Sequence, residues 1–356
     1  MKSKVYFIPI KDSASVAEQT EKMKKIVDFS QAENIVSPED FVAVKFHVGE
    51  GENKTRVAPE LIKVVVDKIK QKKGQPFLTE TSTLYKGERE NAVKHIMHAH
   101  RQGFGIESVG APFVMSDGLL GNTEHEVEIN CELNKTVKIA KEVVNTDAVI
   151  VVSHPTGHVI AGVGACIKNL GMGFASRQGK MRQHSQMKPE VKSSCRFCKK
   201  CISWCPESAI TEKDEKAYID SSKCIGCGEC IAVCNFDAVT YDYNNDSEFV
   251  QKSMAEYAYG AVKDKKNKIF YFNVLINMTK ECDCYAENQP KLIPDVGILA
   301  SSDPVAIDKA TLDLTCEANG QNLGEIAFSY HDPLIQIKHA EKIGMGSSEY
   351  ELVVVE

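Results

Sequence analysis

Two runs of four cysteines dominate this sequence, because eight of its thirteen cysteines fall within forty residues. The first run is C-R-F-C-K-K-C-I-S-W-C over 195–205, and the second is C-I-G-C-G-E-C-I-A-V-C over 224–234. Each run has the spacing C-x2-C-x2-C-x3-C, and the second repeats the first 29 residues later. A repeated spacing of this kind indicates metal ligands rather than cysteines scattered through a core.

The spacing predicts two iron–sulfur clusters. Three closely spaced thiolates bind one cubane, while the fourth cysteine of the same run binds the other cluster. The expected ligands are Cys195, Cys198, Cys201 and Cys234 for the first cluster, and Cys224, Cys227, Cys230 and Cys205 for the second. Glycines at 226 and 228 suit a backbone folded tightly around a cluster. A pair of structural zinc sites is the alternative, although zinc sites usually show two separated C-x2-C pairs.

This segment resembles bacterial-type two-cluster ferredoxins over about 192–242. Asn235 departs from the pattern, because that family usually has proline after the fourth cysteine. The change removes no ligand, but it affects the conformation of the second loop. The resemblance implies a small α+β module whose two 4Fe–4S clusters transfer electrons.

The composition excludes several other classes of protein. The 356 residues are 26% charged and 43% hydrophobic, which is usual for globular chains. The net charge of −6 gives no basic signal for a nucleic-acid partner. No apolar run approaches the ~20 residues of a membrane span, and the stretch at 5–10 is too short for a signal peptide. Many cysteines without an export signal predict a reducing, cytoplasmic location.

Around the cysteine runs, short β-rich segments alternate with helical patterns. We expect strands at 5–10, 41–46, 76–78, 147–152, 269–275 and 296–300, and helices at 15–29, 59–72, 91–101, 136–144, 247–263, 305–316 and 333–343. Such alternation predicts an α/β fold, with a layered sheet covered by helices. The expected organisation is a discontinuous α/β domain over 1–190 and 243–356, interrupted by a small ferredoxin-like α+β domain over 191–242.

Four loop segments of the predicted α/β domain concentrate reactive side chains. They cover 45–51, 79–83, 153–173, and 282–284 followed by 301–304. Loops beyond the carboxyl ends of strands are where open α/β sheets bind their ligands. We take Lys45, His47, His154 and His158 as candidate catalytic residues.

Lys45 stands on an apolar strand, where an unpaired ammonium is costly. It either pairs with a carboxylate such as Glu80 or binds an anionic substrate. His154 and His158 share one segment, and both residue types can ligate a metal or transfer protons. Four other histidines are expected to be solvated, namely His95, His98, His100 and His125.

The other cysteines raise a separate question. Cys282 and Cys284 are separated by one residue, so both reach one metal ion only from a loop or tight turn. They could instead accept electrons as a disulfide, or be inert buried thiols. We expect Cys131, Cys166 and Cys316 to behave as small core hydrophobes.

A basic stretch precedes and enters the cysteine runs. Between 177 and 200 there are eight basic residues and one acid, a local charge of +7. The basic residues are Arg177, Lys180, Arg182, Lys188, Lys192, Arg196, Lys199 and Lys200. The stretch is either a solvated linker, a docking patch for an acidic redox partner, or an anion site.

The loop segments also carry a family resemblance. The stretches 44–50, 153–173, 281–284 and 294–306 resemble the domain-of-unknown-function family 362, which often carries a ferredoxin-like insert. The resemblance implies an α/β domain interrupted by a two-cluster module, without a defined reaction, substrate or catalytic residue set. The family has a weaker likeness to the nickel-cofactor lactate racemase fold. That likeness is an analogy only, because fold does not imply function.

These observations favour a cytoplasmic, ferredoxin-dependent oxidoreductase. Electrons would enter from a ferredoxin-like partner or another oxidoreductase, pass through two 4Fe–4S clusters, and reach a polar pocket in the α/β domain. There Lys45 would bind or polarise a small anionic or carbonyl substrate, and His154 or His158 would supply protons. Cys282 and Cys284 would hold an additional metal ion or act as thiols. The alternatives are a non-enzymatic electron carrier or docking scaffold, and a non-redox metal enzyme with structural clusters.

Overall fold

An eight-stranded mixed sheet forms the centre of the computed structural model, which describes residues 2–184, 189–240 and 246–356. The strand order is β16-β1-β15-β14-β7-β2-β3-β4. The bounds are β1 (Ser3–Pro9), β2 (Phe41–Lys45), β3 (Gln75–Glu80), β4 (Phe113–Met115), β7 (Ala148–Ser153), β14 (Ile269–Leu275), β15 (Gly297–Ser301) and β16 (Tyr350–Val354).

The sheet is mainly parallel. Strands β14, β7, β2, β3 and β4 are parallel neighbours, whereas β15 is antiparallel to both β14 and β1. Every residue of β7 is buried; Val149 and Val151 face one apolar core, and Ile150 and Val152 face the other. Burial on both faces explains why the sequence of this strand is almost continuously apolar.

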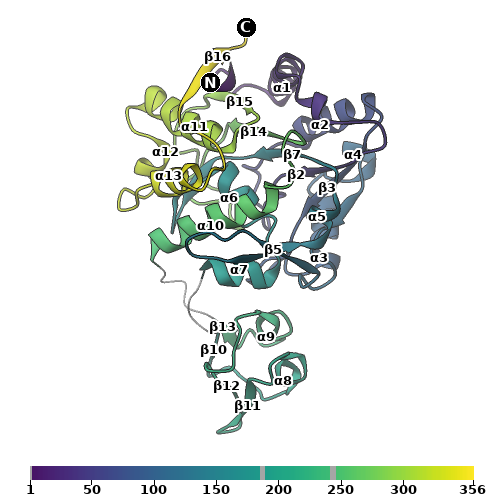
Figure 1. The fold of residues 1–356 in the computed structure, drawn as a ribbon, viewed down its shortest axis with the longest axis vertical. Helices are drawn as coiled ribbons and strands as arrows, with labels where there is room; N and C mark the ends of the chain where they lie inside the picture. Colours follow the sequence, from purple (N-terminus) through teal and green to yellow (C-terminus); the bar gives the residue numbers. More distant parts are fainter. Residues whose placement is uncertain (1, 185–188, 241–245) are drawn as a thin grey trace.

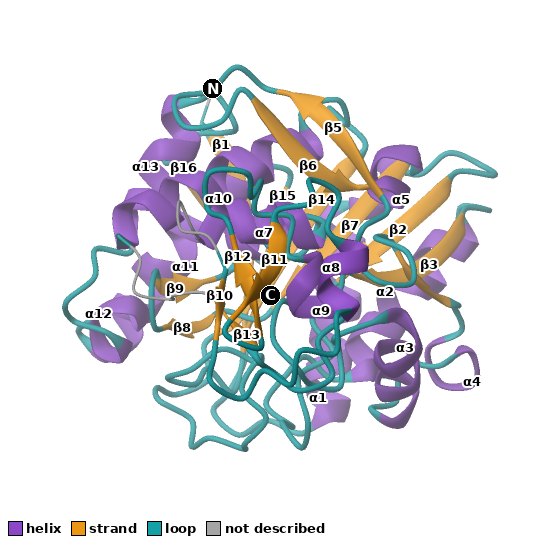
Figure 2. Ribbon diagram, turned by 90° about the horizontal axis from the view of Figure 1, so that it is seen from below, coloured by secondary structure: helices purple, strands orange, loops and turns teal. Residues whose placement is uncertain are grey.

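Helices cover both faces of the sheet (Figure 1 and Figure 2). One face packs against α1 (Val16–Ser30), α2 (Pro59–Gln71) and α3 (Ala92–Arg101). The other packs against α6 (Cys166–Gly171), α10 (Ser247–Val262), α11 (Pro304–Asn319) and α13 (Leu334–Lys342). The predicted layered α/β fold is therefore confirmed. In the described ranges, no helix is long and apolar enough to span a lipid bilayer.

Shorter elements complete the domain. They are η1 (Ala32–Ile35), α4 (Ile106–Val109), α5 (Lys141–Asn145), α7 (Arg177–His184) and α12 (Leu323–Ala327), with the strand pairs β5 (Glu124–Glu128) and β6 (Thr136–Ala140), and β8 (Thr156–His158) and β9 (Gly162–Gly164). The helix expected at 136–144 is wrong over 136–140, where β6 lies, whereas 141–144 are helical and belong to α5. Val137 and Ile139 are buried and alternate with less buried neighbours, which is the period of a strand.

A small cysteine-rich unit projects from one end of the α/β domain (Figure 1). It contains β10 (Glu190–Val191), α8 (Lys200–Trp204), β11 (Ile210–Lys213), β12 (Lys216–Ile219), α9 (Glu229–Ala232) and β13 (Val239–Thr240). Because β10 pairs with β13, the two ends of the unit meet. We call residues 190–240 the cysteine unit. The expected domain border at 242/243 lies outside the described residues.

Candidate functional site

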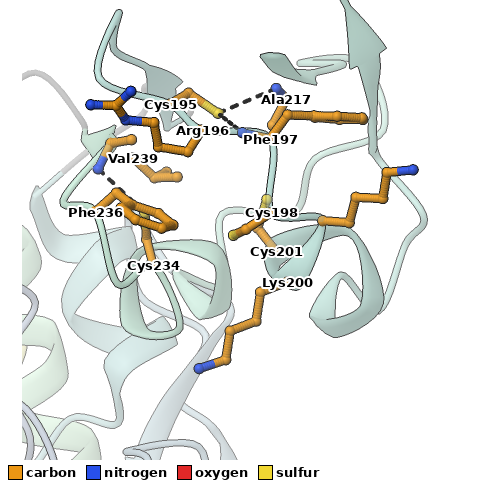
Figure 3. A pocket seen from close by; sticks show the side chains of 12 residues that line it. Cys195, Arg196, Phe197, Cys198, Lys200, Cys201, Ala217, Cys234, Phe236 and Val239 are labelled. Atoms are coloured by element: carbon orange, nitrogen blue, oxygen red, sulfur yellow. Dashed lines mark hydrogen bonds between the residues drawn. The ribbon is translucent and has the colours of Figure 1, made fainter. Parts of the chain in front are cut away.

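Four cysteines line one cavity in the cysteine unit (Figure 3). Cys195, Cys198 and Cys201 come from the first run, and Cys234 comes from the end of the second. Backbone N–H groups at 197 and 217 donate to Cys195 Sγ at 3.4 and 3.5 Å. Such bonds stabilise a thiolate and tune the potential of any cluster that it holds. We call this cavity cage one.

A second cavity, cage two, repeats the arrangement. Its cysteines are Cys205 from the first run and Cys224, Cys227 and Cys230 from the second. The N–H at 226 donates to Cys224 Sγ at 3.4 Å, and the N–H at 209 donates to Cys205 Sγ at 3.3 Å. Helices α8 and α9 follow left-handed residues at 199 and 228, so the 29-residue sequence repeat is also a structural repeat. The cysteines are grouped as their spacing predicts, and iron ligation by these sets stays a prediction.

The cages fit a cluster better than a single ion. In a cubane each iron takes one cysteine, so the four thiolates surround a volume rather than a point. Across the described residues, no three His, Cys, Asp or Glu side chains converge on a position for one metal ion. Both cavities therefore have the donor set of a 4Fe–4S cluster without the convergence of a structural zinc site.

Cage two faces the α/β domain. Gly228, at the start of α9, lies so close to α7 that a Cβ there would stand 3.0 Å from Met181 Cγ and 3.4 Å from Arg177 Cγ. Lys86 Nζ donates to the carbonyl oxygen at the end of α9 at 3.0 Å. Leu84 and Met181 also belong to the apolar cluster that forms the core of the cysteine unit. Side chains of the domain thus complete the small core of the unit.

A buried polar centre lies at the carboxyl ends of the central strands. Lys45 ends β2, Glu80 ends β3, and His154 directly follows β7. The loop after β14 adds Asp283, whose carboxylate contacts His154. Because these strands are parallel neighbours, their ends converge on one edge of the sheet, where α/β proteins place ligands.

Lys45 pairs with a carboxylate, which is the first of the two expectations for it. Its Nζ lies 3.5 Å from Glu80 Oε1, and it donates to Asn169 Oδ1 at 2.6 Å and to Phe46 O at 2.5 Å. Burial lowers the pKa of Lys45 to about 8, although Glu80 opposes the shift. Gly173 is required here, because a Cβ would stand 2.4 Å from Lys45 Cε.

Glu80 also contacts two residues that the sequence pattern did not mark as part of a site. Its carboxylate lies 2.9 Å from His95 Nε2 and 3.8 Å from Arg89 Nη1, and Arg89 Nε pairs with Glu50 at 3.0 Å. His95 is fully buried, so the expectation that it is solvated is wrong. A signal was present, because His95 occupies the inward face of α3 between Ala92 and Ala99.

The other three histidines expected to be solvated differ in burial. His98 is buried and its Nε2 lies 3.1 Å from Gly49 O, which contradicts the expected solvation. His100 and His125 are exposed, as expected.

His47 is held between a backbone donor and a cation. The N–H of Gly49 donates to its Nδ1 at 3.0 Å, and Arg89 Nη1 lies 3.0 Å from its Nε2. Burial, reinforced by Arg89, holds the pKa of His47 well below its usual value. Both ring nitrogens face donors, and a neutral imidazole accepts from only one of them, so His47 lines the polar centre as a neutral side chain with one accepted hydrogen bond.

His154 is an ion-paired imidazolium. Its Nδ1 lies 2.8 Å from Asp283 Oδ2 and its Nε2 lies 2.7 Å from Ile276 O. Both partners are acceptors, so both nitrogens carry protons. Burial lowers the pKa of His154, but the Asp283 carboxylate outweighs it and raises the pKa above the usual value. His154 therefore positions the loop that carries Asp283.

His158 and Lys168 have unused donors in the part of the chain that the structure describes. Backbone N–H groups of Ile160 and Ala161 donate to His158 Nδ1, which leaves the proton on Nε2. Burial, with the Lys168 charge, holds the pKa of His158 well below its usual value. Burial also lowers the pKa of Lys168 to about 8. Within the described residues, Lys168 Nζ has no ion-pair or hydrogen-bond partner.

Cys282 and Cys284 form a disulfide, so in this state neither sulfur is a thiolate available to a metal ion. A disulfide is one of the states expected for this pair, and both electron acceptance and metal binding by the two sulfurs stay predictions. Among the remaining cysteines, Cys166 is buried as expected, whereas Cys131 is half-buried and Cys316 is exposed. The core role expected for Cys316 is wrong, because its position on α11 faces solvent.

The basic stretch at 177–200 divides into a buried and an exposed part. Arg177 and Lys180 are buried, and Lys180 Nζ donates to Thr81 Oγ1 and to Ala175 O at 2.8 Å. The exposed cations are Lys192, Arg196, Lys199 and Lys200, and the last three line cage one. Lys188 lies outside the described residues. The stretch at 177–200 is therefore not a single solvated linker.

Known relatives match short parts of the chain. One component of the ion-translocating oxidoreductase complex from Methanosarcina acetivorans is 40% identical over 62 residues, which cover 16% of this chain and 23% of that protein. Ferredoxin 7Fe from Hydrogenibacillus schlegelii is 32% identical over 71 residues, 20% of this chain and 77% of the ferredoxin. The chain spans about a fifth of the length of the first curated relatives that it matches.

Two further comparisons cover most of the chain. The lactate racemase apoprotein from Thermoanaerobacterium thermosaccharolyticum superimposes with a TM-score of 0.43 at 12% identity, covering 77% of this chain and 51% of that chain. The family model described as Domain of unknown function (DUF362) matches residues 42–313. That match covers about three quarters of the sequence. The chain belongs to the DUF362 family and carries a ferredoxin-type cysteine segment within it.

Proposed function

We propose that this protein is an iron–sulfur oxidoreductase of the cytoplasm, in which two 4Fe–4S clusters pass electrons to the polar centre of the α/β domain. Cage one would hold one cluster and cage two the other. The carrying observation is that two four-cysteine cavities occur in series, with the second packed against α7 and the 84–86 loop. The likeness to ferredoxins supports the same cofactor.

The entry point for electrons is cage one. Arg196, Lys199 and Lys200 are exposed and line this cavity, beside α8, which lies farther from the α/β domain than α9 does (Figure 1). A cationic rim attracts an acidic partner and accelerates the encounter of the two proteins. An acidic ferredoxin-like donor or another oxidoreductase is therefore the partner that fits this end.

The electron-consuming end is the polar centre, and its unused donors indicate an anionic substrate. Lys168 presents an ammonium that has no partner among the described residues, and its charge acts on the neighbouring His158 ring, whose Nε2 carries a proton. Lys45 already has Glu80 and Asn169 as partners. We therefore assign anion binding to Lys168 and hydrogen-bond donation from Nε2 to His158, while Lys45 and His154 position the neighbouring loops.

Iron analysis of single-cysteine variants tests the cluster assignment. Anaerobically reconstituted wild-type protein should bind about eight irons, since each cubane holds four. Cys198→Ser in cage one and Cys227→Ser in cage two should each weaken one cluster and remove its electron paramagnetic resonance signal. Cys316→Ser is the matched control, because its thiol is exposed and outside both cages. Equal iron loss in the control would contradict the assignment.

A non-enzymatic electron carrier is the second candidate, and the cationic rim favours it. The two candidates differ at Lys168. For an enzyme, Lys168→Gln should abolish the reoxidation of reduced clusters by a small anionic substrate, yet leave their reduction by an acidic partner unchanged. If no small carboxylate or phosphate compound reoxidises the wild-type protein, the carrier interpretation is correct.

A further inference from the structure

The Cys282–Cys284 turn is clamped on both sides. The Asp283 side chain between the two cysteines pairs with His154 at 2.8 Å and accepts a hydrogen bond from Thr55 Oγ1 at 3.2 Å. The Asp283 carbonyl accepts from the N–H of Glu50 at 2.9 Å. These contacts hold the turn that carries both sulfurs.

One short loop connects this turn with the cysteine unit. Leu84 packs in the same apolar cluster as Cys230 of cage two, and Lys86 donates to the end of α9. Tyr85, which lies between them, donates from its hydroxyl group to Cys284 O at 3.4 Å. Of these three consecutive residues, Leu84 shares an apolar cluster with a cage cysteine, Tyr85 contacts the disulfide turn, and Lys86 contacts the helix of cage two. Electron transfer through packed and covalently linked atoms needs such a short, continuous connection.

We propose that the Cys282–Cys284 disulfide is the two-electron acceptor of the clusters. The pair takes up two electrons, one from each reduced cluster, and its S–S bond breaks. Each sulfur then binds one proton from solvent, which reaches the pair at the half-buried Cys284. The products are two thiols and two oxidised clusters, so electrons and protons balance. This inference rests on the proposed function and names its first acceptor.

The number of electrons that each group carries explains why two clusters would be combined with one disulfide. A 4Fe–4S cluster transfers one electron, whereas most reductions of organic substrates need two. Two cages provide two electrons, and a disulfide can store both in the dithiol state. The Cys282–Cys284 pair would thus convert two single-electron deliveries into one two-electron reductant beside the polar centre.

Anaerobic reductive titration tests the proposal. The holoprotein is reduced with a photoreduced deazaflavin, a low-potential one-electron donor, and the electrons taken up per chain are counted. Wild type should accept about four electrons, two in the clusters and two in the disulfide. The Cys282→Ser/Cys284→Ser variant should accept about two, with unchanged cluster signals. After iodoacetamide treatment, mass spectrometry should show both cysteines alkylated in reduced wild type and neither in the oxidised protein.

Two further results separate the inference from the proposed function. If both proteins accept the same number of electrons and the pair resists alkylation while the clusters are reduced, the acceptor assignment is overturned and the proposed function stands. If the clusters themselves do not form or accept electrons, the proposed function fails. Leu84→Ala should slow disulfide opening at least several-fold without slowing cluster reduction. An unchanged opening rate would show that the deazaflavin reduces the disulfide directly, which also overturns the proposal.

Discussion

The cysteine unit and the polar centre both gather reactive side chains, but the chain brings those side chains together in opposite ways. The eight cage cysteines lie between 195 and 234, and local spacing decides which of them meet. The polar centre collects side chains from 45 to 283, which meet only because the sheet aligns the ends of its strands. We expect the first region to depend on its ligand for order, whereas the second is ordered by the core around it.

Apolar burial shows the same difference. The cysteine unit has one small apolar cluster, to which Leu84 and Met181 of the α/β domain contribute. The α/β domain has two large cores, one on each face of its sheet. A unit of this size rarely buries enough apolar surface to fold without a metal, a disulfide or a partner. The clusters should therefore contribute much of the folding free energy of the unit.

Removal of iron should produce the largest effect, and in one region only. In the apoprotein we expect residues 190–240 to lose amide-exchange protection completely, because a small metal-dependent unit is unfolded without its ligand. Strands β7 and β14 should keep the protection that they have in the holoprotein, since their core contains no cysteine cage. Hydrogen exchange with mass spectrometry measures both regions in one sample. Equal loss of protection in β7 would show that the order of the α/β domain also depends on the clusters.

The next largest effect is expected within the α/β domain, from loss of the Asp308 carboxylate that accepts hydrogen bonds from the start of α6. Asp308 accepts hydrogen bonds at 2.8 Å from the N–H groups of Cys166 and Ile167 and from Asn273. Replacement by alanine leaves two buried backbone donors unpaired, while Asn273 keeps Thr311 Oγ1 as an acceptor, so Asp308→Ala should lower the free energy of unfolding by about 3 kcal/mol. Lys168 and Asn169 belong to the same helix, so anion binding should weaken as well.

Asp246→Ala is the matched control for that variant. Asp246 is exposed and caps α10 by accepting from the N–H of Glu248 at 3.0 Å. Loss of this cap should cost about 1 kcal/mol, without an effect on anion binding. Urea unfolding monitored by circular dichroism gives both values. A cost for Asp308→Ala no larger than that of the control would show that α6 is held by packing alone.

The contrast between the regions also explains what the sequence could predict. The cage groupings follow from the spacing of the cysteines, and the strands β7 and β14 follow from mainly apolar segments of six and seven residues. The polar centre is predictable only in part. Lys45 stands out as a cation on an apolar strand, whereas Arg89 lies in a loop and its burial depends on tertiary contacts with Glu50 and Glu80.

The wrong assignments have a related cause. The helix expected at 136–144 is wrong over 136–140, because five residues of alternation are a weak signal beside a run that also suits a helix. His95 is expected in solvent by residue type alone, although α3 has its apolar face at that position. Neither the disulfide of Cys282 and Cys284 nor the environment of the Lys168 ammonium can be derived from spacing, since both depend on which loops pack around them.

Charge reversal at cage one should produce a kinetic effect of intermediate size. Replacing Lys199 and Lys200 by glutamate should slow reduction by an acidic ferredoxin about tenfold at low salt, because steering by opposite charges is lost. The rates of variant and wild type should converge at high ionic strength, where screening removes the attraction. Stopped-flow absorbance of the clusters measures the rate. Lys213→Glu is the control, because this exposed cation does not line the cage; an equal effect there would indicate a general charge effect.

The smallest expected effect is the pH dependence of anion binding at the polar centre. It distinguishes a change in the charge of this site from a change in the stability of the fold. Burial lowers the pKa of Lys168 to about 8, so its ammonium is charged below this pH and neutral above it. The dissociation constant of a carboxylate probe, measured by calorimetry, should be constant below pH 7 and rise up to about tenfold by pH 9. Lys168→Gln should bind the probe weakly at every pH. A variant that keeps the wild-type profile would assign the titration to another group, such as Lys45, whose pKa is also lowered to about 8.

Stability should change in the opposite direction over the same pH range. Between about pH 8 and the ordinary lysine pKa of 10.5, the unfolded chain binds more protons at Lys168 than the folded chain does. By linkage, the contribution of this group to the free energy of unfolding therefore rises with pH while anion affinity falls. A loss of affinity above pH 8 that coincides with partial unfolding would contradict this assignment. A loss of affinity in a protein that stays folded would show that the polar centre binds its ligand through the charge of Lys168.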